Sequence, residues 1–345
     1  MWSVGAQRLV YKVTGSHPRR KVSSLPPDAG LSLKKGALIY NPIAGRRPAA
    51  RQREIRKAAD VLRAAGLDID LAPTLGPAMA HKLAEEVAAK GADFILACGG
   101  DGTINEIING LAGRETPLGI LPGGTANILA REVGLPLDPV RAASQFARWT
   151  PRRIPLGKAT WHTEGALPGS TGAPNGSSTR FFMTVAGIGY DAQVVYKLSL
   201  EMKLSWGVVG YIIEALRQAF RYPFQGFSCR TDDGPERFAT FAAAQRARNY
   251  GGWLHLTPGA RFFHDRFNLC LFKSVNRARY FLYAALVLAR QHFLLDDVEL
   301  VEARKLRCAA QSAGETIRFE LDGELVGALP ATFEIVPDAL TLLVP

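Results

Sequence analysis

Short apolar runs alternate with segments of helical periodicity in the first half of the chain. The runs ALIYN, LDIDLA, DFILAC and PLGIL predict strands, and the segments that follow them predict helices at 48–65, 77–90, 103–111 and 125–133. Strands and helices that alternate in this way are typical of a parallel sheet covered by helices. We therefore expect an α/β domain over residues 36–150.

The pattern changes after about Thr150. Helical periodicity fades, and turn residues separate the shorter β-type runs FFMTVAGIG, RFATFAAAQ, FNLCLF, TIRFELDG and TFEIV. This pattern predicts a β-rich, antiparallel second domain over 151–330, interrupted by one helical segment at 204–220.

Two segments show no sustained period. Residues 1–35 carry Pro, Ser and basic residues and are expected to form a flexible basic leader. The tract EGALPGSTGAPNGSST at 164–179 has almost nothing to bury and is expected to be a hairpin loop or an insertion.

Composition fits two domains and an anionic partner. The chain has 345 residues, 47% of them hydrophobic, and its formal charge of +11 should attract nucleotides, nucleic acid or acidic lipid headgroups. Its four cysteines form no CxxC pair, so we expect neither a disulfide framework nor a zinc site, and a reducing cytoplasmic setting.

Neither export nor membrane crossing is expected. Polar and basic residues interrupt the N-terminal apolar runs, so no secretory signal is visible. The most apolar stretches, 208–219 and 280–295, are too short or too interrupted to span about 30 Å of hydrocarbon. The protein is expected to lie on a membrane without crossing it.

The strongest chemical signal is FILACGGDGTINEIINGL at 94–111, where an apolar strand runs into glycines and then into a helix. Gly99, Gly100 and Gly102 would let a phosphate approach the backbone, and the helix start would present N–H groups to it. Asp101 would stand beside that phosphate, where a carboxylate can hold Mg²⁺ or accept a proton. The alternative is an ordinary turn with Thr103 as the helix N-cap.

A second unit of the same design follows in LGILPGGTANILARE at 118–132. Gly123, Gly124 and Thr125 again join a strand to a helix, and Asn127 repeats the offset of Asn105 from its threonine. Because the carboxyl ends of parallel strands share one edge of a sheet, the two loops can border one crevice and contact one nucleotide. A tandem of helix caps would explain the threonines but not the paired glycines.

Further upstream, LIYNPIAGRR places Asn41, Pro42 and Gly45 after the first strand, which alone is a weak phosphate-loop signal. The chain contains no GxxxxGK[ST], and no GxGxxG follows a strand, so a Walker A site and a dinucleotide Rossmann site are both disfavoured.

The segments NPIAG, GGDGTINEIINGL and PLGILPGGTANILAREVGLP resemble the successive signatures of the diacylglycerol kinase and sphingosine kinase superfamily. The resemblance continues through FFMTVAGIGYDAQV, ARNYGGWLHLTPGARF and LDGE, so it covers roughly residues 36–345. It implies a nucleotide-binding α/β domain related to those of NAD kinases and phosphofructokinases, followed by a β-sandwich domain. It also implies that the final segment, 331–345, returns to the first domain.

The resemblance implies specific site residues. The residues assigned to ATP are Asn41, Pro42, Ile43, Ala44, Gly45, Thr74, Gly99, Gly100, Gly102, Thr103, Asn105, Glu106, Gly124, Thr125, Asn127 and Glu324. Asp322 is implied to be the general base for a lipid hydroxyl, and Asp101 is expected to help place the Mg²⁺ that accompanies ATP. From the residues alone, IRFELDGEL is an alternating strand pattern around an Asp-Gly turn.

The family's GxGxDA segment is matched by Gly187, Gly189 and Asp191, which are expected to line the substrate cleft between the domains. A glycine bulge and an aspartate helix cap would explain them almost as well. The chain departs from many bacterial members at Ile128 and Pro155, where those members have aspartates, and at 264–268, which keeps a single aspartate of the family's DDGxxD stretch.

Together these features predict an ATP-dependent lipid kinase that phosphorylates diacylglycerol, a sphingoid base, ceramide or a related lipid. We expect peripheral association with the anionic inner face of the membrane and no nucleic-acid partner, because the positive charge is scattered and no reader motif appears. A soluble NAD kinase-like enzyme and a non-catalytic nucleotide- or lipid-binding regulator remain alternatives.

Overall fold

The computed structural model describes residues 33–42, 48–76, 78–162, 176–198, 208–250, 254–312 and 314–345. The first domain contains the strands β1 (Lys35–Tyr40), β2 (Asp68–Pro73), β3 (Phe94–Gly99) and β4 (Leu118–Pro122). Its helices are α1 (Pro48–Ala64), α2 (Ala80–Ala89), α3 (Asp101–Leu111), α4 (Ile128–Glu132), α5 (Pro139–Ala143) and the short 3₁₀ helix η1 (Phe146–Arg148).

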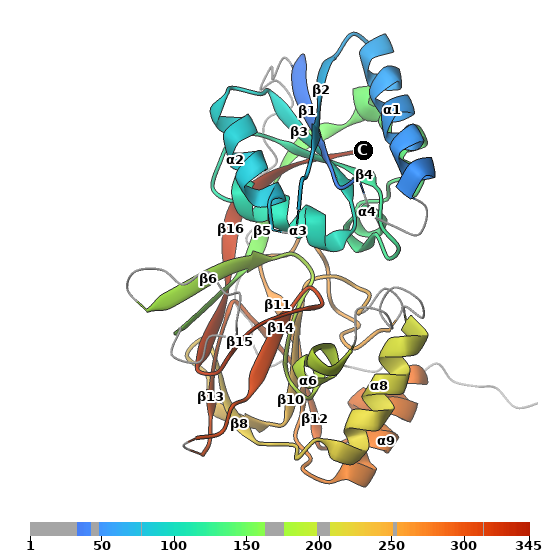
Figure 1. The fold of residues 1–345 in the computed structure, drawn as a ribbon. Helices are drawn as coiled ribbons and strands as arrows, with labels where there is room; N and C mark the ends of the chain where they lie inside the picture. Colours follow the sequence, from blue (N-terminus) through green and yellow to red (C-terminus); the bar gives the residue numbers. More distant parts are fainter. Residues whose placement is uncertain are drawn as a thin grey trace, which may run out of the picture.

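The four strands form a parallel sheet in the order β2-β1-β3-β4, as the sequence predicts. All six residues of the central strand β3 are buried, which explains its uniformly apolar sequence. Helices α1 and α2 lie on opposite sides of the strands (Figure 1). Gly110 allows the α2–α3 contact, because a Cβ atom there would lie 2.4 Å from the carbonyl oxygen of His81.

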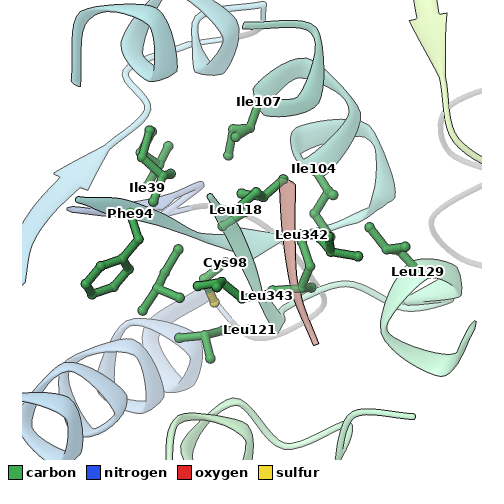
Figure 2. Packing of buried hydrophobic residues seen from close by; sticks show 14 of the residues in the cluster. Ile39, Phe94, Cys98, Ile104, Ile107, Leu118, Leu121, Leu129, Leu342 and Leu343 are labelled. Atoms are coloured by element: carbon green, nitrogen blue, oxygen red, sulfur yellow. The ribbon is translucent and has the colours of Figure 1, made fainter. Parts of the chain in front are cut away.

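The core of this domain lies between the sheet and its helices. Phe94, Cys98 and Leu121 come from the strands, and Ile104 and Ile107 come from α3 (Figure 2). Leu342 and Leu343, from the C-terminal end of the chain, complete the same cluster. The first domain therefore needs the last residues of the chain to close its core.

The second domain is a sandwich of two antiparallel layers. Its strands are β5 (Thr150–His162), β6 (Ser177–Phe182), β7 (Val185–Gly189), β8 (Phe227–Thr231), β9 (Glu236–Ala239), β10 (Phe241–Gln245), β11 (Phe267–Phe272), β12 (Val298–Ala303), β13 (Lys305–Ala310), β14 (Arg318–Leu321), β15 (Glu324–Ala328) and β16 (Ala331–Val344). Its helices are α6 (Tyr190–Lys197), α8 (Val208–Arg221), α9 (Arg277–Leu288) and the 3₁₀ helix η3 (His292–Leu294).

One layer of the sandwich is the six-stranded sheet β12-β11-β10-β7-β14-β15. The other belongs to the long sheet that runs β2-β1-β3-β4-β16-β13-β8-β9, with β5 beside β16. Buried residues of both layers, such as Phe182, Phe227, Phe267, Phe319 and Phe333, form the sandwich core between them. On the outer face of the six-stranded sheet, a second aromatic cluster includes Tyr222 and Phe224, which follow α8, and Tyr280 and Tyr283 of α9.

Strands β5 and β16 join the two domains (Figure 1). Residues 331–336 of β16 pair with β5 in the second domain, and residues 331–334 pair with β13. After an irregularity between Val336 and Leu340, residues 340–344 pair with the first residues of β5, and Leu342 pairs with Leu118 of β4. The return of the chain to the first sheet thus begins near residue 340 and not at 331, because residues 331–336 still belong to the sandwich.

Several local predictions need correction. Helix α3 begins at Asp101 with Gly100 as its N-cap, so Thr103 does not cap it. Helix α4 begins at Ile128 and not near Thr125, because residues 123–127 are used by the loop before it. Residues 177–179 of the predicted loop tract are part of β6. The leader up to residue 32, and residues 163–175, lie outside the described residues.

Candidate functional site

The carboxyl ends of the four parallel strands form one edge of the first domain. In register, Tyr40 of β1 lies opposite Pro73 of β2 and Cys98 of β3, and Gly99 of β3 lies opposite Pro122 of β4. The predicted segments at Asn41–Pro42, Thr74, Gly99–Gly102 and Gly123–Thr125 therefore follow neighbouring strands. Ile43, Ala44 and Gly45 lie outside the described residues.

The two glycine loops pack directly against each other. The N–H of Gly123 donates to the carbonyl oxygen of Gly99 at 3.1 Å. A Cβ atom on Gly123 would lie 2.7 Å from the backbone nitrogen of Gly99, and one on Gly124 would lie 2.5 Å from the Cα of Gly100. Glycine is required at 123 and 124 because backbone meets backbone there, a reason that sequence analysis alone did not supply.

The side chain of Asp101 ties the first loop to the second. Its Oδ1 accepts a hydrogen bond from the N–H of Ile128 at 2.8 Å, at the start of α4. Burial raises the pKa of the Asp101 carboxyl, backbone N–H groups of α4 oppose this shift, and the nearby Asp322 carboxylate adds to it. The two acidic groups are thus close enough to influence each other across the domain junction.

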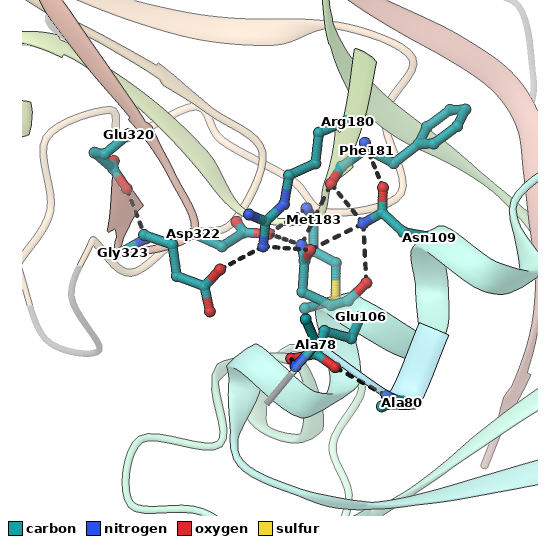
Figure 3. Close-up of polar contacts among 12 residues, drawn as sticks. Ala78, Ala80, Glu106, Asn109, Arg180, Phe181, Met183, Glu320, Asp322 and Gly323 are labelled. Atoms are coloured by element: carbon teal, nitrogen blue, oxygen red, sulfur yellow. Dashed lines mark hydrogen bonds and ion pairs between the residues drawn. The ribbon is translucent and has the colours of Figure 1, made fainter. Parts of the chain in front are cut away.

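Other predicted nucleotide residues have local structural partners. Asn127 closes its own loop, because its side chain accepts from the N–H of Gly124 at 2.8 Å and donates to the Gly124 carbonyl at 3.0 Å. Glu106 accepts from the N–H groups of Ala78 and Ala80 at 3.3 and 3.0 Å, so it caps the start of α2 (Figure 3). Thr125 is exposed at the tip of the second loop.

The second domain contributes the turn between β14 and β15. Asp322 and Gly323 have φ values of +51° and +83°, which are the positive values that a two-residue Asp-Gly hairpin turn requires. The hairpin predicted from IRFELDGEL is confirmed. This turn carries Asp322 and Glu324 to the glycine loops of the first domain.

The carboxylate of Asp322 accepts five hydrogen bonds. Its Oδ1 accepts from the N–H of Thr184 at 2.7 Å, the Thr184 hydroxyl at 2.6 Å and the N–H of Val185 at 3.1 Å. Its Oδ2 accepts from the N–H of Met183 at 2.7 Å and from the side-chain amide of Asn105 at 2.6 Å. Four of these donors belong to the second domain, and Asn105 is the one that belongs to the first.

Glu324 lies over the first glycine loop. A Cβ atom on Gly102 would approach its Oε1 to 2.8 Å, so glycine at 102 leaves room for this carboxylate. Arg180 of β6 forms an ion pair with Glu324 and donates to Asn105 Oδ1 at 3.4 Å (Figure 3). Arg180 is a site residue that sequence analysis missed, because no motif marks it.

Asn109 also joins the domains. Its side chain donates to the carbonyl of Phe181 at 3.0 Å and accepts from the Phe181 N–H at 2.8 Å, so it pairs with β6 as a neighbouring strand would (Figure 3). Asn109 lies one helical turn after Asn105, and its amide also donates to Asn105 Oδ1 at 2.9 Å. The i, i+4 spacing of these two asparagines was the available signal for a polar face on α3.

A buried arginine lies behind the Asp322 turn. Arg246 donates to the carbonyls of Met183 at 2.9 Å and Phe262 at 3.0 Å, and also to that of Pro155. Burial lowers its pKa to about 10, and the Asp322 carboxylate opposes this shift. The guanidinium therefore fixes the backbone segment whose N–H groups hold Asp322.

Gly187 and Asp191, predicted to line the substrate cleft, lie in the interior of the second domain, where Asp191 is 2% exposed. A Cβ atom on Gly187 would lie 1.9 Å from Asp191 Oδ2 and 2.6 Å from Glu320 Oε1, so the glycine makes room for two facing carboxyl groups. Tyr211 donates to Asp191. Gly189 instead borders a pocket of about 260 Å³ within the second domain.

This buried acid pair touches the turn at Asp322 and Gly323. Glu320 Oε2 accepts a hydrogen bond from the N–H of Gly323 at 2.6 Å. Burial is the main cause that raises the pKa of Glu320 well above its usual range, and the negative charge of Asp191 adds to it. Glu320 therefore holds its proton to a higher pH in the folded protein than in the unfolded chain.

The described residues contain no group of three or more His, Cys, Asp or Glu side chains arranged to hold a metal ion. Asp101 and Glu324 nevertheless supply hard oxygen donors of the kind that Mg²⁺ takes, and Mg²⁺ commonly needs only one or two protein carboxylates when it arrives with a nucleotide. In the part of the chain that the structure describes, no helix is long and apolar enough to cross a membrane.

A parallel sheet that ends in two glycine loops, closed by an acidic turn from a β-sandwich, defines a two-domain kinase. The diacylglycerol kinase catalytic domain model matches residues 35–159, and the YegS C-terminal NAD kinase beta sandwich-like domain model matches residues 184–344. The chain is 30% identical over 269 residues to a diacylglycerol kinase of Mycobacterium tuberculosis. These residues cover 77% of this chain and 81% of that protein.

A diacylglycerol kinase of Bacillus subtilis is 26% identical over 305 residues, with 87% of this chain and 93% of that protein covered. A crystal structure of a diacylglycerol kinase from Bacillus anthracis shares the fold, with a TM-score of 0.68 at 23% identity over 91% of this chain and 98% of that chain. The chain belongs to the diacylglycerol kinase family and is a lipid kinase, as the sequence predicts.

The contact between the glycine loops predicts the effect of Gly124→Ala. The added methyl group would meet the Gly100 backbone at 2.5 Å and separate the loops, so we expect a loss of about 1–3 kcal/mol in the free energy of unfolding and weaker ATP binding. Denaturant unfolding and nucleotide titration measure both. Gly76→Ala is the control, because the nearest atom there lies 3.7 Å away. Equal effects of the two substitutions would contradict the account.

The raised pKa of Glu320 predicts a pH dependence of stability. Because the unfolded chain loses this proton near pH 4.5 and the folded protein holds it to a higher pH, the contribution of Glu320 to stability falls as pH rises above that value. Glu320→Gln lacks this pH-dependent contribution. Between pH 5 and pH 8 we therefore expect the free energy of unfolding of the variant to rise relative to that of the wild type by about 1 kcal/mol or more. Denaturant unfolding across this pH range measures the difference, and parallel curves for the two proteins would show that Glu320 is not protonated.

Proposed function

We propose that this lipid kinase transfers the γ-phosphoryl group of ATP to a hydroxyl of diacylglycerol or of a related lipid such as a sphingoid base or ceramide. The observation that carries the proposal is the meeting of the two glycine loops with the Asp322–Glu324 turn at one place between the domains. The names of the relatives support diacylglycerol as the first acceptor to test.

The glycine loops would hold the triphosphate. The first N–H groups of α3 have no acceptor within the helix, and the positive end of its dipole adds to their attraction for phosphate. Thr125 is exposed at the tip of the second loop and would add a hydroxyl donor. Asn41, Pro42 and Thr74, at the ends of the neighbouring strands, would border the rest of the nucleotide, with Ile43, Ala44 and Gly45 assigned to it by resemblance.

Asp322 would take the proton of the lipid hydroxyl. Its five hydrogen bonds leave no lone pair for a sixth donor, because a carboxylate offers about four acceptor positions. The amide of Asn105 is the donor that comes from the other domain, so it is the one that an incoming hydroxyl would replace at Oδ2. Phosphoryl transfer needs alignment and charge neutralisation more than covalent help, which these groups and Arg180 would supply.

Mg²⁺ bound with ATP would neutralise the phosphate charge. Asp101 belongs to the first glycine loop and Glu324 lies over Gly102, so these two carboxylates would hold it together with the phosphate oxygens. Asp101 would do so through Oδ2, because Oδ1 accepts from the start of α4. The lipid would enter from a membrane surface, and peripheral association with the anionic cytoplasmic face is part of the proposal; the charge of +11 supports it.

The function is tested by incubating the protein with labelled ATP and Mg²⁺ and with separate acceptors: diacylglycerol, sphingosine, ceramide, a total lipid extract and NAD. We expect label in a lipid product and none in NAD. Label in NAD alone would establish the soluble kinase alternative. No ATP consumption with any acceptor, despite ATP binding, would establish a non-catalytic regulator.

Paired substitutions test the role of Asp322. We expect Asp322→Asn to lower kcat by about 10²–10⁴-fold with nucleotide affinity changed only a few-fold, because the general base is lost while the glycine loops remain. Glu324→Gln should raise the KM for ATP more than it lowers kcat. Steady-state kinetics and nucleotide titration separate the two effects. The reverse pattern, with turnover retained in Asp322→Asn and lost in Glu324→Gln, would make Glu324 the base.

A further inference from the structure

Helix α8 exposes apolar side chains and buries polar ones. Glu214 and Gln218 are only 5% and 4% exposed and form a hydrogen bond with each other. The opposite face carries large apolar side chains at spacings of four, three and four residues, with exposures of 52, 37, 43 and 65%: Val209, Ile213, Leu216 and Phe220. This arrangement reverses the usual one for a helix on a protein surface in water.

Helix α9 extends the same apolar surface. It packs beside α8 (Figure 1), and the rings of Phe220 and Phe281 meet with their centroids 4.7 Å apart. Leu282 and Leu288 of α9 are also exposed, and so is Leu294 in the turn that follows. Exposed apolar surface that is contiguous across two elements marks an interaction site more often than scattered single residues do. We call the exposed side of α8 and α9 the α8–α9 face.

The charged groups on the α8–α9 face have one sign. Arg217, Arg221 and Arg277 are exposed on the two helices, and Arg290 follows two residues after α9. Glu214 is the one acidic residue within the two helices; it is buried, and its Oε2 forms an ion pair with Arg217 Nη1 at 3.7 Å. The face therefore combines aliphatic and aromatic side chains with a cationic rim.

We propose that the α8–α9 face docks on an anionic lipid bilayer, with its apolar side chains at the boundary between headgroups and acyl chains and its arginines on the lipid phosphates. This inference rests on the proposed function, since a bilayer is where the lipid substrate lies. Charge decides the occupant: a second copy of the same face would bring arginine against arginine, whereas anionic headgroups attract all of them. The buried Glu214 removes the one carboxylate that would repel the headgroups.

Vesicle co-sedimentation tests this face without any turnover. The full-length protein is mixed with vesicles of phosphatidylcholine, alone or with phosphatidylglycerol, in the absence of ATP. We expect Val209→Gln/Ile213→Gln/Leu216→Gln/Phe220→Gln to weaken binding to the anionic vesicles by about tenfold or more. Glutamine keeps the helix propensity of these positions. Arg221→Gln/Arg277→Gln should weaken binding by about fivefold for each arginine on anionic vesicles only.

Leu137→Gln is the matched control, because Leu137 is a 42% exposed leucine of the first domain, and its binding should equal that of the wild type. Thermal unfolding confirms that all variants are folded. Phosphorylation of a short-chain, water-soluble diacylglycerol should be retained by the fourfold variant, since its catalytic groups are intact. A wild type that binds anionic vesicles but phosphorylates no acceptor would end the proposed function and leave the docking face standing.

Two results would overturn the docking proposal. The first is vesicle binding by the fourfold variant equal to that of the wild type. The second is a wild type that is dimeric in light scattering and becomes monomeric in the fourfold variant, because the face would then join two copies of the chain.

Discussion

The arrangement of the site depends on the hydrogen bonds to one carboxylate. Asp322 binds three backbone N–H groups and a hydroxyl of residues 183–185, and it also binds the amide of Asn105 in α3. The first set fixes the acidic turn within the sandwich, and the last joins that turn, before an acceptor hydroxyl replaces it, to the helix whose start borders the glycine loops. A shift of either element would separate the groups proposed to bind nucleotide from those proposed to face the acceptor.

The surrounding structure supports this contact from both domains. Gly123 and Gly124 let the two loops meet backbone to backbone, so the side of the site proposed to bind nucleotide is one surface. Arg246 donates to the carbonyl of Met183, and Glu320 accepts from the N–H of Gly323. These contacts within the second domain hold the acidic turn in place. Strands β5 and β16, which pass through both domains, limit how far the two halves can separate.

The parts of the site that sequence analysis predicted are those made by residues close together in the chain. The strand–glycine–helix units and the Asp-Gly hairpin have local signals, and the structure has both. Arg180 and Arg246 have none, because Arg180 meets a carboxylate 144 positions away and Arg246 binds a carbonyl 91 positions away. Sequence analysis placed Asp191 at the substrate cleft, whereas the structure buries it in the second domain. A GxGxDA motif has the same sequence in both settings. The exposed face of α8 was also hidden, since its sequence is apolar on more than one side and only packing shows which side is covered.

The most direct measurement is a crystal structure with Mg²⁺ and a non-hydrolysable ATP analogue. We predict phosphates on the backbone N–H groups of residues 100–103 and 125, with the γ-phosphate facing the Asp322–Glu324 turn. A nucleotide that contacts one glycine loop alone, or whose γ-phosphate points away from Asp322, would contradict this prediction.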